Sequence, residues 1–521
     1  MTGTDEDAGP RPATFTVHSP AGGDPLGEHP VHGPQDVALA VERARTAAAG
    51  WAALSAAHRR DHLLRWKRKL ASSLDAVAQA IAAETGKPRG DAVLEVILTL
   101  EHLDWAARNA DRVLRGRRVR GGLLAVNQRA TVAHRPLGVI GVIGPWNYPL
   151  YTPMGSIGYA LAAGNTVVFK PSEHTPGTGV LLAELLASAV PEHAGLLTIV
   201  TGAAATGEAL ARSGVDKVAF TGSPGTARKV MAVCARSLTP LLAECGGKDA
   251  TIVTVDADLD AAADAVVWGA MSNAGQTCAG VERVYCVREV HALFCRKVVE
   301  RAEALRVGPV PDADYGPMTT PAQTAVVRRH VDQALAAGAR ALLGGTASTS
   351  NSAPAPASTS VSVSTSGPAS GAYVTPVVLV DVPEESAAMT EETFGPVVAI
   401  NAVASTDEAV QRANASPYAL AASVFCHDRR AGAAIAARLR AGAVSVNSVL
   451  GFAAVPALPF GGSGESGFGR IHGADGLRAF TAPQSVTVQR FAPPVDLTSF
   501  RTPSAARARA VAVARWLHHR R

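Results

Sequence analysis

The amino-acid sequence predicts an α/β protein built around a parallel, doubly wound sheet. Short apolar runs rich in Val and Ile recur beyond about residue 135, and several are separated by segments of helical length. The chain has 521 residues, 47% of them hydrophobic, which is enough to bury a large core in two or more units. In such a protein we expect ligands to bind beyond the carboxyl ends of the strands.

The section from about Gln35 to Leu114 is predicted to be helical. Clusters of Ala and Leu alternate there with charged residues at helical spacing, most clearly in Val37–Ala49, His58–Leu70 and Asp91–Ala107. Residues 1–29 precede this section. They begin with an acidic stretch that lacks the apolar core of a signal peptide, so they are interpreted as an N-terminal tail.

Predicted strands and helices alternate after the helical section. Pro136–Phe169 has no charged residue, but its prolines and glycines favour buried strand, loop and short helix over a membrane span. Helices are expected at Gly177–Ala189 and Gly207–Ser213. The expected strands are Val139–Ile143, Thr166–Phe169, Leu197–Val200, Val218–Thr221 and Thr251–Val255.

Three other segments differ in character. Gly121–His134 alternates like a strand with no helix after it, which predicts a protruding hairpin that pairs with another subunit. Residues 345–371 are rich in Ser, Thr, Pro and Ala and are predicted to be a disordered surface insertion. Phe500–Arg521 contains arginines and histidines but no acid. We favour a solvated tail there over a membrane-docking amphipathic helix, because its apolar face is mostly Ala.

Charge and cysteine usage narrow the class of protein. The net charge of +5 is small for the length, so small metabolites are expected as partners rather than nucleic acid. The six cysteines form no CxxC pair and have no His at metal-ligand spacing, which argues against disulfides and a metal site. A reducing compartment, the cytoplasm, is expected.

Cys278 is the candidate nucleophile. It lies in Asn273–Gly280, a stretch of small and polar residues whose backbone amides can approach a reacting carbonyl. Asn147, after a predicted strand, could donate to an oxyanion, although an Asn between two prolines can also form a turn. Glu244 precedes two glycines and could activate water, although a surface Glu at a turn would look the same.

Two further patches suit a nucleotide. Lys170 and Glu173 follow a predicted strand and could hold ribose hydroxyls, or they could be a solvated ion pair. Gly222 and Ser223 lie where a strand gives way to a helix, a place where backbone amides can face a phosphate. Glycine at such a turn is also ordinary structure. The string Gly462–Gly467 fits GxGxxG, but no βαβ unit surrounds it, so it is rejected as a dinucleotide site.

Together these patches resemble the aldehyde dehydrogenase superfamily over about Pro30 to Phe491. Seven motifs occur in the family's order, and agreement of seven by chance is negligible. The motifs are Pro145–Pro149, Lys170–Glu173, Phe220–Ser223, Glu244–Lys248, Gly275–Cys278, Glu391–Pro396 and Pro459–Gly462.

The resemblance implies the aldehyde dehydrogenase fold, with a Rossmann-like cofactor domain, an α/β catalytic domain and a β oligomerisation arm. The implied boundaries are 30–244 for the cofactor domain, interrupted by the hairpin at 121–134, and 245–447 for the catalytic domain. A return segment with an oligomerisation strand is expected at 448–492, and a basic tail at 493–521. A homodimer or homotetramer is expected.

The resemblance also implies a mechanism. Cys278 would attack the aldehyde, Asn147 and the Cys278 N–H would hold the oxyanion, and Glu244 would activate the water that hydrolyses the thioester. Because Glu244 is present, hydrolysis is expected in place of acyl transfer to coenzyme A. Glu173 favours NAD, with NADP as the alternative. The implied cofactor residues are Trp146, Lys170, Glu173, Gly222, Ser223, Glu392 and Phe394.

The substrate class is inferred from departures within the resemblance. Gly155 and Ser272 stand where the succinic-semialdehyde branch carries carboxylate-binding arginines, and Gly280 replaces that branch's second cysteine. Gly469–Gly473 resembles the branch that oxidises fatty and aromatic aldehydes, so apolar aldehydes are expected. The alternatives are a divergent succinate-semialdehyde dehydrogenase and a non-catalytic member of the family. Cys245, which replaces a leucine after Glu244, is interpreted as a packing residue.

Overall fold

The computed structural model describes residues 13–122, 125–310, 312–344, 373–493 and 495–519. The chain divides into two compact units, one made of Met1–Val113 and Pro136–Phe480 and one made of Leu114–Arg135 and Thr481–Arg521. The insertion predicted at 345–371 lies outside the described residues.

Six strands form the first sheet of the larger unit. They are β5 (Val139–Ile143), β6 (Thr166–Lys170), β7 (Leu197–Ile199), β8 (Lys217–Gly222), β9 (Leu241–Cys245) and β17 (Gly467–Phe468). Their order is β17-β9-β8-β5-β6-β7, with β5 to β9 parallel and β17 antiparallel to β9. The parallel sheet that the sequence predicts is therefore present.

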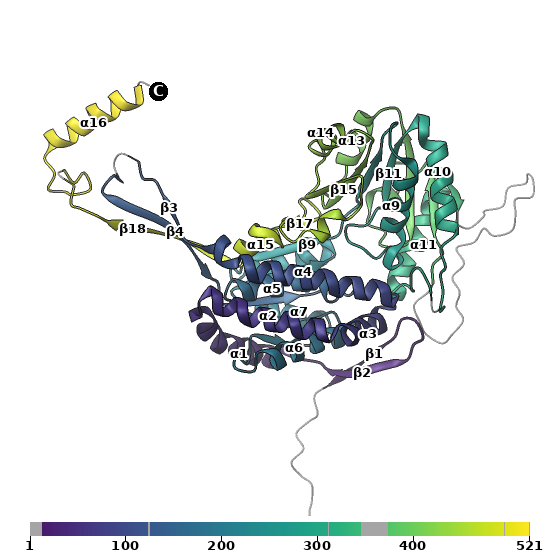
Figure 1. Ribbon diagram of the computed structural model, residues 1–521, viewed down its shortest axis with the longest axis horizontal. Coiled ribbons are helices and arrows are strands. Elements are labelled where there is room, and N and C mark those ends of the chain that lie inside the picture. Colours follow the sequence, from purple (N-terminus) through teal and green to yellow (C-terminus); the bar gives the residue numbers. More distant parts are fainter. Residues whose placement is uncertain (1–12, 123–124, 311, 345–372, 494, 520–521) are drawn as a thin grey trace, which may run out of the picture. The chain divides into compact units, whose positions relative to one another are not determined.

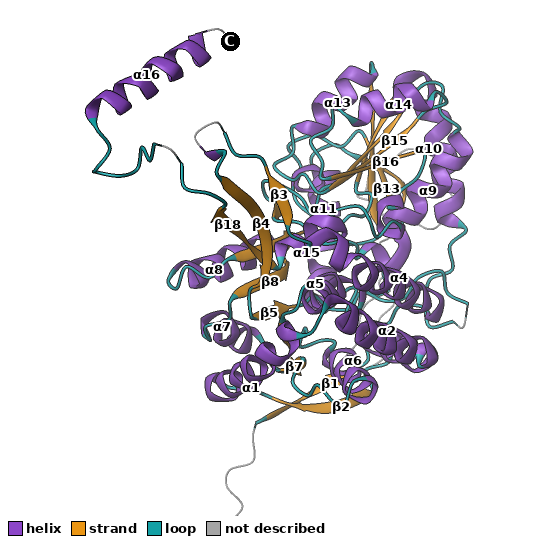
Figure 2. Ribbon diagram, turned by 60° about the vertical axis from the view of Figure 1, so that its left-hand side comes forward, coloured by secondary structure: helices purple, strands orange, loops and turns teal. Residues whose placement is uncertain are grey.

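Helices cover both faces of this sheet. They are α1 (Pro34–Ala53), α2 (Ala56–Ser72), α3 (Leu74–Thr85), α4 (Arg89–Leu114), α5 (Tyr151–Ala162), α6 (Pro176–Ala189), α7 (Ala204–Arg212), α8 (Pro224–Ala235) and α15 (Gly473–Ala479). Figure 2 shows α1, α7 and α8 on one side of the strands and α5 and α6 on the other. The predicted helical section is confirmed as α1 to α4.

A second, seven-stranded sheet follows in the chain. Its strands are β10 (Ala250–Val253), β11 (Arg283–Val287), β12 (Arg340–Leu343), β13 (Val377–Val380), β14 (Val397–Val403), β15 (Ala421–Phe425) and β16 (Ala443–Val446). Their order is β12-β13-β14-β11-β10-β15-β16, and only the β12 pairing is antiparallel. The helices of this sheet are α9 (Leu259–Met271), α10 (Arg288–Glu303), α11 (Pro321–Ala336), α12 (Ala387–Thr390), α13 (Thr406–Asn414) and α14 (Arg429–Ala436). Figure 1 shows strands β11 and β15 between α13 and α14 on one side and α9 and α10 on the other.

The uncharged stretch Pro136–Phe169 folds as the sequence predicts. It supplies β5, a loop, α5 and β6, and every residue of both strands is buried. In α5 all residues from Thr152 to Ala162 are buried as well. A helix buried all round belongs to a protein core. Across the described ranges, no helix has the length and apolar character needed to span a bilayer.

Two parts of the larger unit differ from expectation. Residues assigned to the N-terminal tail form a two-stranded antiparallel hairpin, β1 (Thr14–His18) and β2 (Pro25–Pro30). The prolines at both ends of β2 hid this strand, because proline cannot donate to a ladder and is confined to strand ends and edges. The second difference is β9, a strand that the sequence analysis did not predict. It places Glu244 inside the protein, not at a surface turn.

The smaller unit is a three-stranded antiparallel sheet followed by a helix. Its strands β3 (Arg117–Val119), β4 (Gln128–Pro136) and β18 (Thr481–Gln489) have the order β18-β4-β3. The predicted hairpin therefore spans 117–136, a few residues more than expected. The C-terminal tail differs from a frayed chain because it contains α16 (Ser504–His519), in which no residue is buried.

Candidate active site

The loop that carries Cys278 is bent by three consecutive residues in the left-handed region. Asn273, Ala274 and Gly275 have φ of 52°, 55° and 71°, directly after the end of α9. Non-glycine residues in this region cost about 1–3 kcal/mol each, so the surrounding structure must hold them in place. At Gly275 a Cβ atom would lie 2.1 Å from the Gly395 carbonyl oxygen, so only glycine fits there. After this bend the chain returns to α9, where the Val281 N–H donates to the Gly269 carbonyl at 3.0 Å.

The Gln276 side chain fixes this loop from within. Its Nε2 donates to the Asn273 carbonyl at 2.9 Å, and its Oε1 accepts from the Thr319 N–H at 2.8 Å. The backbone carbonyl of Gln276 accepts from Asn147 Nδ2 at 2.9 Å. Because an amide carries two N–H donors, the second hydrogen of Asn147 is available to a ligand. The structure thus brings Asn147 to the Cys278 loop, as predicted.

A buried ion pair positions Asn147 through its backbone carbonyl. Lys87 Nζ lies 2.7 Å from Glu95 Oε2, both side chains are inaccessible to solvent, and Lys87 Nζ also donates to the Asn147 carbonyl at 2.8 Å. The other oxygen of Glu95 accepts from the N–H groups of Leu150 and Tyr151 at the start of α5. Sequence reasoning missed this pair, because two charges eight residues apart carry no signal of burial.

Glu244 lies at the end of β9 and is 4% exposed. Its Oε2 accepts from Thr221 Oγ1 at 3.4 Å. Burial raises the pKa of Glu244 to about 8, and the Thr221 hydrogen bond opposes this only in part. A carboxyl with a pKa near neutrality can exchange protons with a bound water during turnover.

The Cys278 thiol lies among acidic groups. Burial raises the pKa of Cys278 well above its ordinary value, and the charges of Glu244, Glu392 and Asp249 add to this, while the Ala279 N–H opposes it. Without a ligand the thiol is therefore protonated at neutral pH. Activation requires a group that removes this proton or a ligand that compensates the negative surroundings.

Two cavities meet at Cys278. One has a volume of about 330 Å³ and the other about 520 Å³, and Cys278, Glu244 and Thr152 line both. The smaller cavity is lined mainly by aromatic and aliphatic side chains, and no Lys or Arg is among its described lining residues. Its apolar walls include Leu94, Leu98, Trp268, Phe452, Phe460 and Ile471.

Several polar side chains interrupt these apolar walls, among them Asp91 and Ser272. Asp91 on α4 and Ser272 after α9 each line the smaller cavity with an oxygen that has no hydrogen-bond partner. Burial raises the pKa of Asp91, and the charge of Lys87 opposes this. Neither Asp91 nor Ser272 offers a positive charge to a carboxylate.

The larger of the two cavities contains five of the predicted cofactor residues. Trp146 and Phe394 both line it and pack edge to face, with ring centroids 5.5 Å apart at 90°. Ser223 caps α8 by accepting from the Thr226 N–H at 3.3 Å. The five residues that line this cavity are Trp146, Gly222, Ser223, Glu392 and Phe394.

Lys170 and Glu173 are the two predicted cofactor residues that do not line this cavity. They lie at the end of β6, next to β5 in the sheet, and Lys170 Nζ is 3.1 Å from Glu173 Oε2. Burial alone would raise the pKa of Glu173, but the charge of Lys170 and the hydrogen bonds to the carboxylate together outweigh burial, and the pKa is lowered. The carboxylate is therefore ionised at neutral pH.

The Glu244–Lys248 motif also shapes the position of Glu392. A Cβ atom at Gly246 would lie 1.9 Å from a Glu392 oxygen, and the Gly247 N–H donates to that oxygen at 3.2 Å. Glycine at these positions therefore lets the carboxylate approach the backbone. Lys248, at the end of the motif, pairs with the buried Glu282.

Glu282 in turn holds the segment that carries Phe394. Its carboxylate oxygens accept from the N–H groups of Thr393 and Phe394, each at 2.9 Å. The sequence analysis did not predict this link, because Lys248 and Glu282 are 34 residues apart and only the fold brings them together.

Two residues that were not predicted to act in catalysis or cofactor binding belong to the first sheet and its core. Gly467 of the rejected GxGxxG string belongs to β17 and pairs with Glu244 in an antiparallel ladder. Cys245 is buried among the hydrophobic side chains behind the first sheet, while also bordering the larger cavity.

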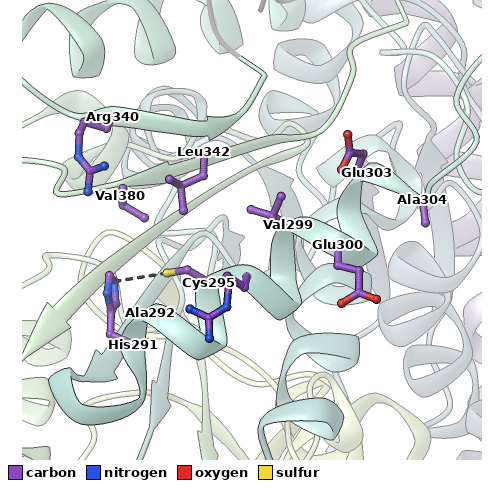
Figure 3. A pocket seen from close by; sticks show the side chains of 11 residues that line it. His291, Ala292, Cys295, Val299, Glu300, Glu303, Ala304, Arg340, Leu342 and Val380 are labelled. Atoms are coloured by element: carbon purple, nitrogen blue, oxygen red, sulfur yellow. Dashed lines mark hydrogen bonds between the residues drawn. The ribbon is translucent and has the colours of Figure 1, made fainter. Parts of the chain in front are cut away.

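A third cavity, of about 750 Å³, lies between α10 and strands β12 and β13 (Figure 3). Figure 3 shows Cys295 and His291 pointing toward one another, with Sγ and Nε2 3.5 Å apart. None of the predicted site residues lines it. The predicted residues Cys278, Glu244 and Asn147 instead line the two smaller cavities, so volume alone does not single out the candidate site.

Known proteins match nearly the whole chain. Residues 8–486 match the family model described as the aldehyde dehydrogenase family. The chain is 36% identical over 482 residues to "4,4'-diapolycopene aldehyde oxidase" of Methylomonas sp, covering 92% of this chain and 86% of that protein. It is 38% identical over 467 residues to "Putative succinate-semialdehyde dehydrogenase (NADP(+))" of Mycolicibacterium smegmatis, covering 88% of this chain and 86% of that protein.

Solved structures give the same fold. The structure of NAD-dependent aldehyde dehydrogenase from Sinorhizobium meliloti superposes with a TM-score of 0.85 at 31% identity, covering 93% of each chain. Lactaldehyde dehydrogenase from Escherichia coli superposes with a TM-score of 0.84 at 29% identity, covering 92% of this chain and 96% of that one.

Proposed function

The chain belongs to the aldehyde dehydrogenase family, which oxidises aldehydes with NAD or NADP, and on this premise we propose that it oxidises apolar aldehydes through a thioester on Cys278. The observation that carries the proposal is the meeting of two unlike cavities at Cys278 and Glu244. The apolar cavity suits an aliphatic or aromatic aldehyde.

The larger cavity fits a dinucleotide. Gly222, Ser223 and Gly225 surround the start of α8, and a Cβ at Gly225 would meet nothing within 4 Å, so backbone N–H groups can approach a pyrophosphate. Trp146 and Phe394 offer aromatic surfaces, and Glu392 offers a carboxylate to ribose hydroxyls. When bound, the nicotinamide supplies a hydride acceptor.

The residues around Cys278 support each step of aldehyde oxidation. The Cys278 thiol first gives its proton to solvent, and the thiolate bonds to the aldehyde carbon, whose carbonyl oxygen becomes an oxyanion. Later turnovers start from the thiolate that hydrolysis regenerates. The free N–H of Asn147 and the Cys278 N–H stabilise that oxyanion. When the hydride leaves, the oxyanion collapses to a carbonyl and a thioester remains on Cys278.

Glu244 completes the reaction in this proposal. It accepts a proton from a water molecule, and the hydroxide bonds to the thioester carbon. The carbon–sulfur bond breaks, and the carboxylic acid and the Cys278 thiolate are released. The sum is one aldehyde, one water and one oxidised cofactor giving one acid, one reduced cofactor and one proton.

The lining of the smaller cavity supports apolar over carboxylated aldehydes. No Lys or Arg is among its described lining residues, whereas the acidic residues Asp91 and Glu244 are. A substrate carboxylate would lose its hydration there without gaining a cation. The two relatives named above differ in their substrates, since one name specifies 4,4'-diapolycopene aldehyde and the other succinate semialdehyde.

For the cofactor we propose a preference for NAD. The ionised Glu173 beside Lys170 can accept from a ribose 2′-OH and would repel a 2′-phosphate. A cytoplasmic location is proposed because all six cysteines are free.

We further propose a homodimer or homotetramer. The smaller unit leaves β3 and β18 as edge strands, and Val486 and Val488 of β18 are 38% and 55% exposed. An exposed edge with apolar side chains suits pairing with a second copy of the chain. Light scattering of the purified protein measures the stoichiometry, and a monomer would contradict this proposal.

The helix α16 is proposed to remain in solvent, because its arginines Arg507, Arg509 and Arg515 are spread around the helix and no residue is buried. The alternative, which we favour less, is that α16 contacts an anionic membrane surface. Vesicle flotation distinguishes the two: the full chain and a chain ending at Pro494 should partition equally.

A substrate panel tests the proposed function. The purified protein is given NAD⁺ and short, long, aromatic and carboxylated aldehydes, and reduction of NAD⁺ is followed. We expect the highest kcat/KM for a long or aromatic aldehyde. A large preference for succinic semialdehyde would contradict the substrate class, and no activity with any aldehyde would favour a non-catalytic role.

A further inference from the structure

His472 lines the aldehyde cavity from an unfavourable backbone conformation. Its φ is 60° and its ψ is 167°, a combination that glycine adopts readily and other residues rarely. The residue is 2% exposed, and its Nε2 has no hydrogen-bond partner. Burial, together with the neighbouring His102, holds the pKa of His472 well below its usual range, so the ring is neutral. Such strain at a cavity wall indicates that the position of this ring matters.

The ring of His472 lies in a notch on α5 made by Gly155. A Cβ atom at Gly155 would be 2.6 Å from His472 Nε2 and 2.9 Å from Ile471 Cδ1, closer than packed atoms can come. His472 and Ile471 line the cavity, whereas Gly155 does not. The ring is therefore held between the backbone of α5 and the space for the aldehyde.

Gly155 has no backbone reason to be glycine. It lies inside α5, where alanine is more favourable, and its φ is not in the left-handed region. What glycine provides at this position is room for the His472 ring.

Aromatic neighbours hold the ring in its notch. The ring centroid of His472 lies 4.0 Å from that of His102 and 5.5 Å from that of Tyr151. His102 Nε2 and the Tyr151 hydroxyl both contact the Ala453 carbonyl, at 2.8 and 3.2 Å. Because Ala453 also lines the cavity, the cluster ties His472 to a second wall segment.

We propose that Gly155 and His472 together set the depth of the aldehyde cavity and so select the length of the aldehyde chain. This rests on the proposed function, since it takes the 330 Å³ cavity as the place of the apolar chain. A side chain at position 155 would push the ring toward the substrate. Loss of the ring would extend the cavity to α5.

Variants at the two positions test this pair. The variants are Gly155→Ala, His472→Gly and the double variant, assayed for kcat/KM with straight-chain aldehydes from propanal to dodecanal at saturating NAD⁺. His472→Gly is chosen because glycine relieves the strained backbone, so folding should be retained. Gly207→Ala is the matched control. Gly207 lies inside another helix, α7, and a Cβ there meets only Ile143, at 3.9 Å.

Gly155→Ala should lower kcat/KM for the longest accepted aldehyde relative to propanal by roughly tenfold or more, the scale of one methylene in a hydrophobic pocket. His472→Gly should move the preferred length upward. The double variant should regain most of the activity with long aldehydes that Gly155→Ala loses, because no ring remains to be displaced and only the end of the flexible Ile471 side chain must shift.

The proposal would be overturned if Gly155→Ala lowered kcat/KM equally for all chain lengths. It would also be overturned if the double variant did not regain activity with the long aldehydes. Unchanged chain-length preference in His472→Gly would overturn it as well, even if Gly155→Ala failed to fold. The wild-type rates test the proposed function separately, since a preference for succinic semialdehyde overturns the substrate class. The ratios of variant to wild-type kcat/KM still measure how Gly155 and His472 affect chain-length preference.

Discussion

The two cavities that meet at Cys278 are built in different ways. The larger one is lined largely by residues of short contiguous motifs at strand ends, such as Gly222 and Ser223 after β8. The smaller one gathers residues from α4, α5 and α9, among them Leu94 and Trp268, and from the loop Val449–Ala454 after β16. The comparison shows that short sequence motifs identify the cofactor cavity, whereas the shape of the substrate cavity depends on tertiary packing.

Replacing the residue that both cavities share should have the largest effect. Cys278→Ala should lower kcat by at least about a thousandfold with every aldehyde, since covalent catalysis is lost. The NADH formation rate measures this. Cys234→Ala is the matched control, because that thiol is buried in the core beside the first sheet and is not among the described lining residues of either cavity, and it should stay active. Full activity of Cys278→Ala would refute the proposed mechanism.

Glu244 separates the two halves of the reaction. Glu244→Gln should slow turnover by about 10²–10⁴-fold, the usual contribution of a general base, while a first burst of NADH persists. In the wild type kcat should rise with pH through about 8, where Glu244 loses its proton, and this inflection should be absent in the variant. A wild-type rate that falls through this range would contradict the role of Glu244 as base.

The same group makes stability depend on pH. Burial raises the pKa of Glu244 from 4.5 to about 8, so the folded state favours the neutral form. Its stabilisation is fully present below pH 4.5 and is lost as pH rises through about 8. Glu244→Gln should therefore have a higher Tm than the wild type above pH 8. A Tm difference that shrinks as pH rises would oppose this assignment.

The buried pair Lys87–Glu95 supports residues of both cavities, since Glu95 lines the smaller one and Lys87 donates to Asn147, which lines the larger one. Lys87→Met leaves the Glu95 charge buried and alone, and should lower the free energy of unfolding by about 3–5 kcal/mol. Denaturant unfolding measures this. The double variant Lys87→Met with Glu95→Gln should recover much of the loss, because no uncompensated charge remains. Equal losses in both variants would show that the pair acts through packing alone.

The smallest effect is expected at the outer edge of the cofactor site. Glu173→Gln should shift the ratio of kcat/KM for NAD and NADP by roughly tenfold toward NADP, since the carboxylate no longer repels a 2′-phosphate. Aldehyde preference should not change. An unchanged ratio would place Glu173 outside the cofactor site, in agreement with its absence from the cavity lining.

The difference between the cavities also explains how far the sequence could be interpreted. Strand β5 matches its predicted range because a run of five buried apolar residues is a strong local signal. Asn147, Glu244 and Cys278 were recognised because the motifs around them are local as well. The burial of Lys87 and the notch at Gly155 for His472 were not predicted, because each depends on residues that meet only after folding.

The central claim is that the aldehyde carbon becomes bonded to Cys278 and is released by Glu244. Its most direct test is mass spectrometry of Glu244→Gln protein quenched during the NADH burst with a long-chain aldehyde. We predict one acyl group per active site, on the peptide that contains Cys278, absent from Glu244→Gln/Cys278→Ala. A full burst with no acylated Cys278, or an acyl group on another residue, would contradict the account.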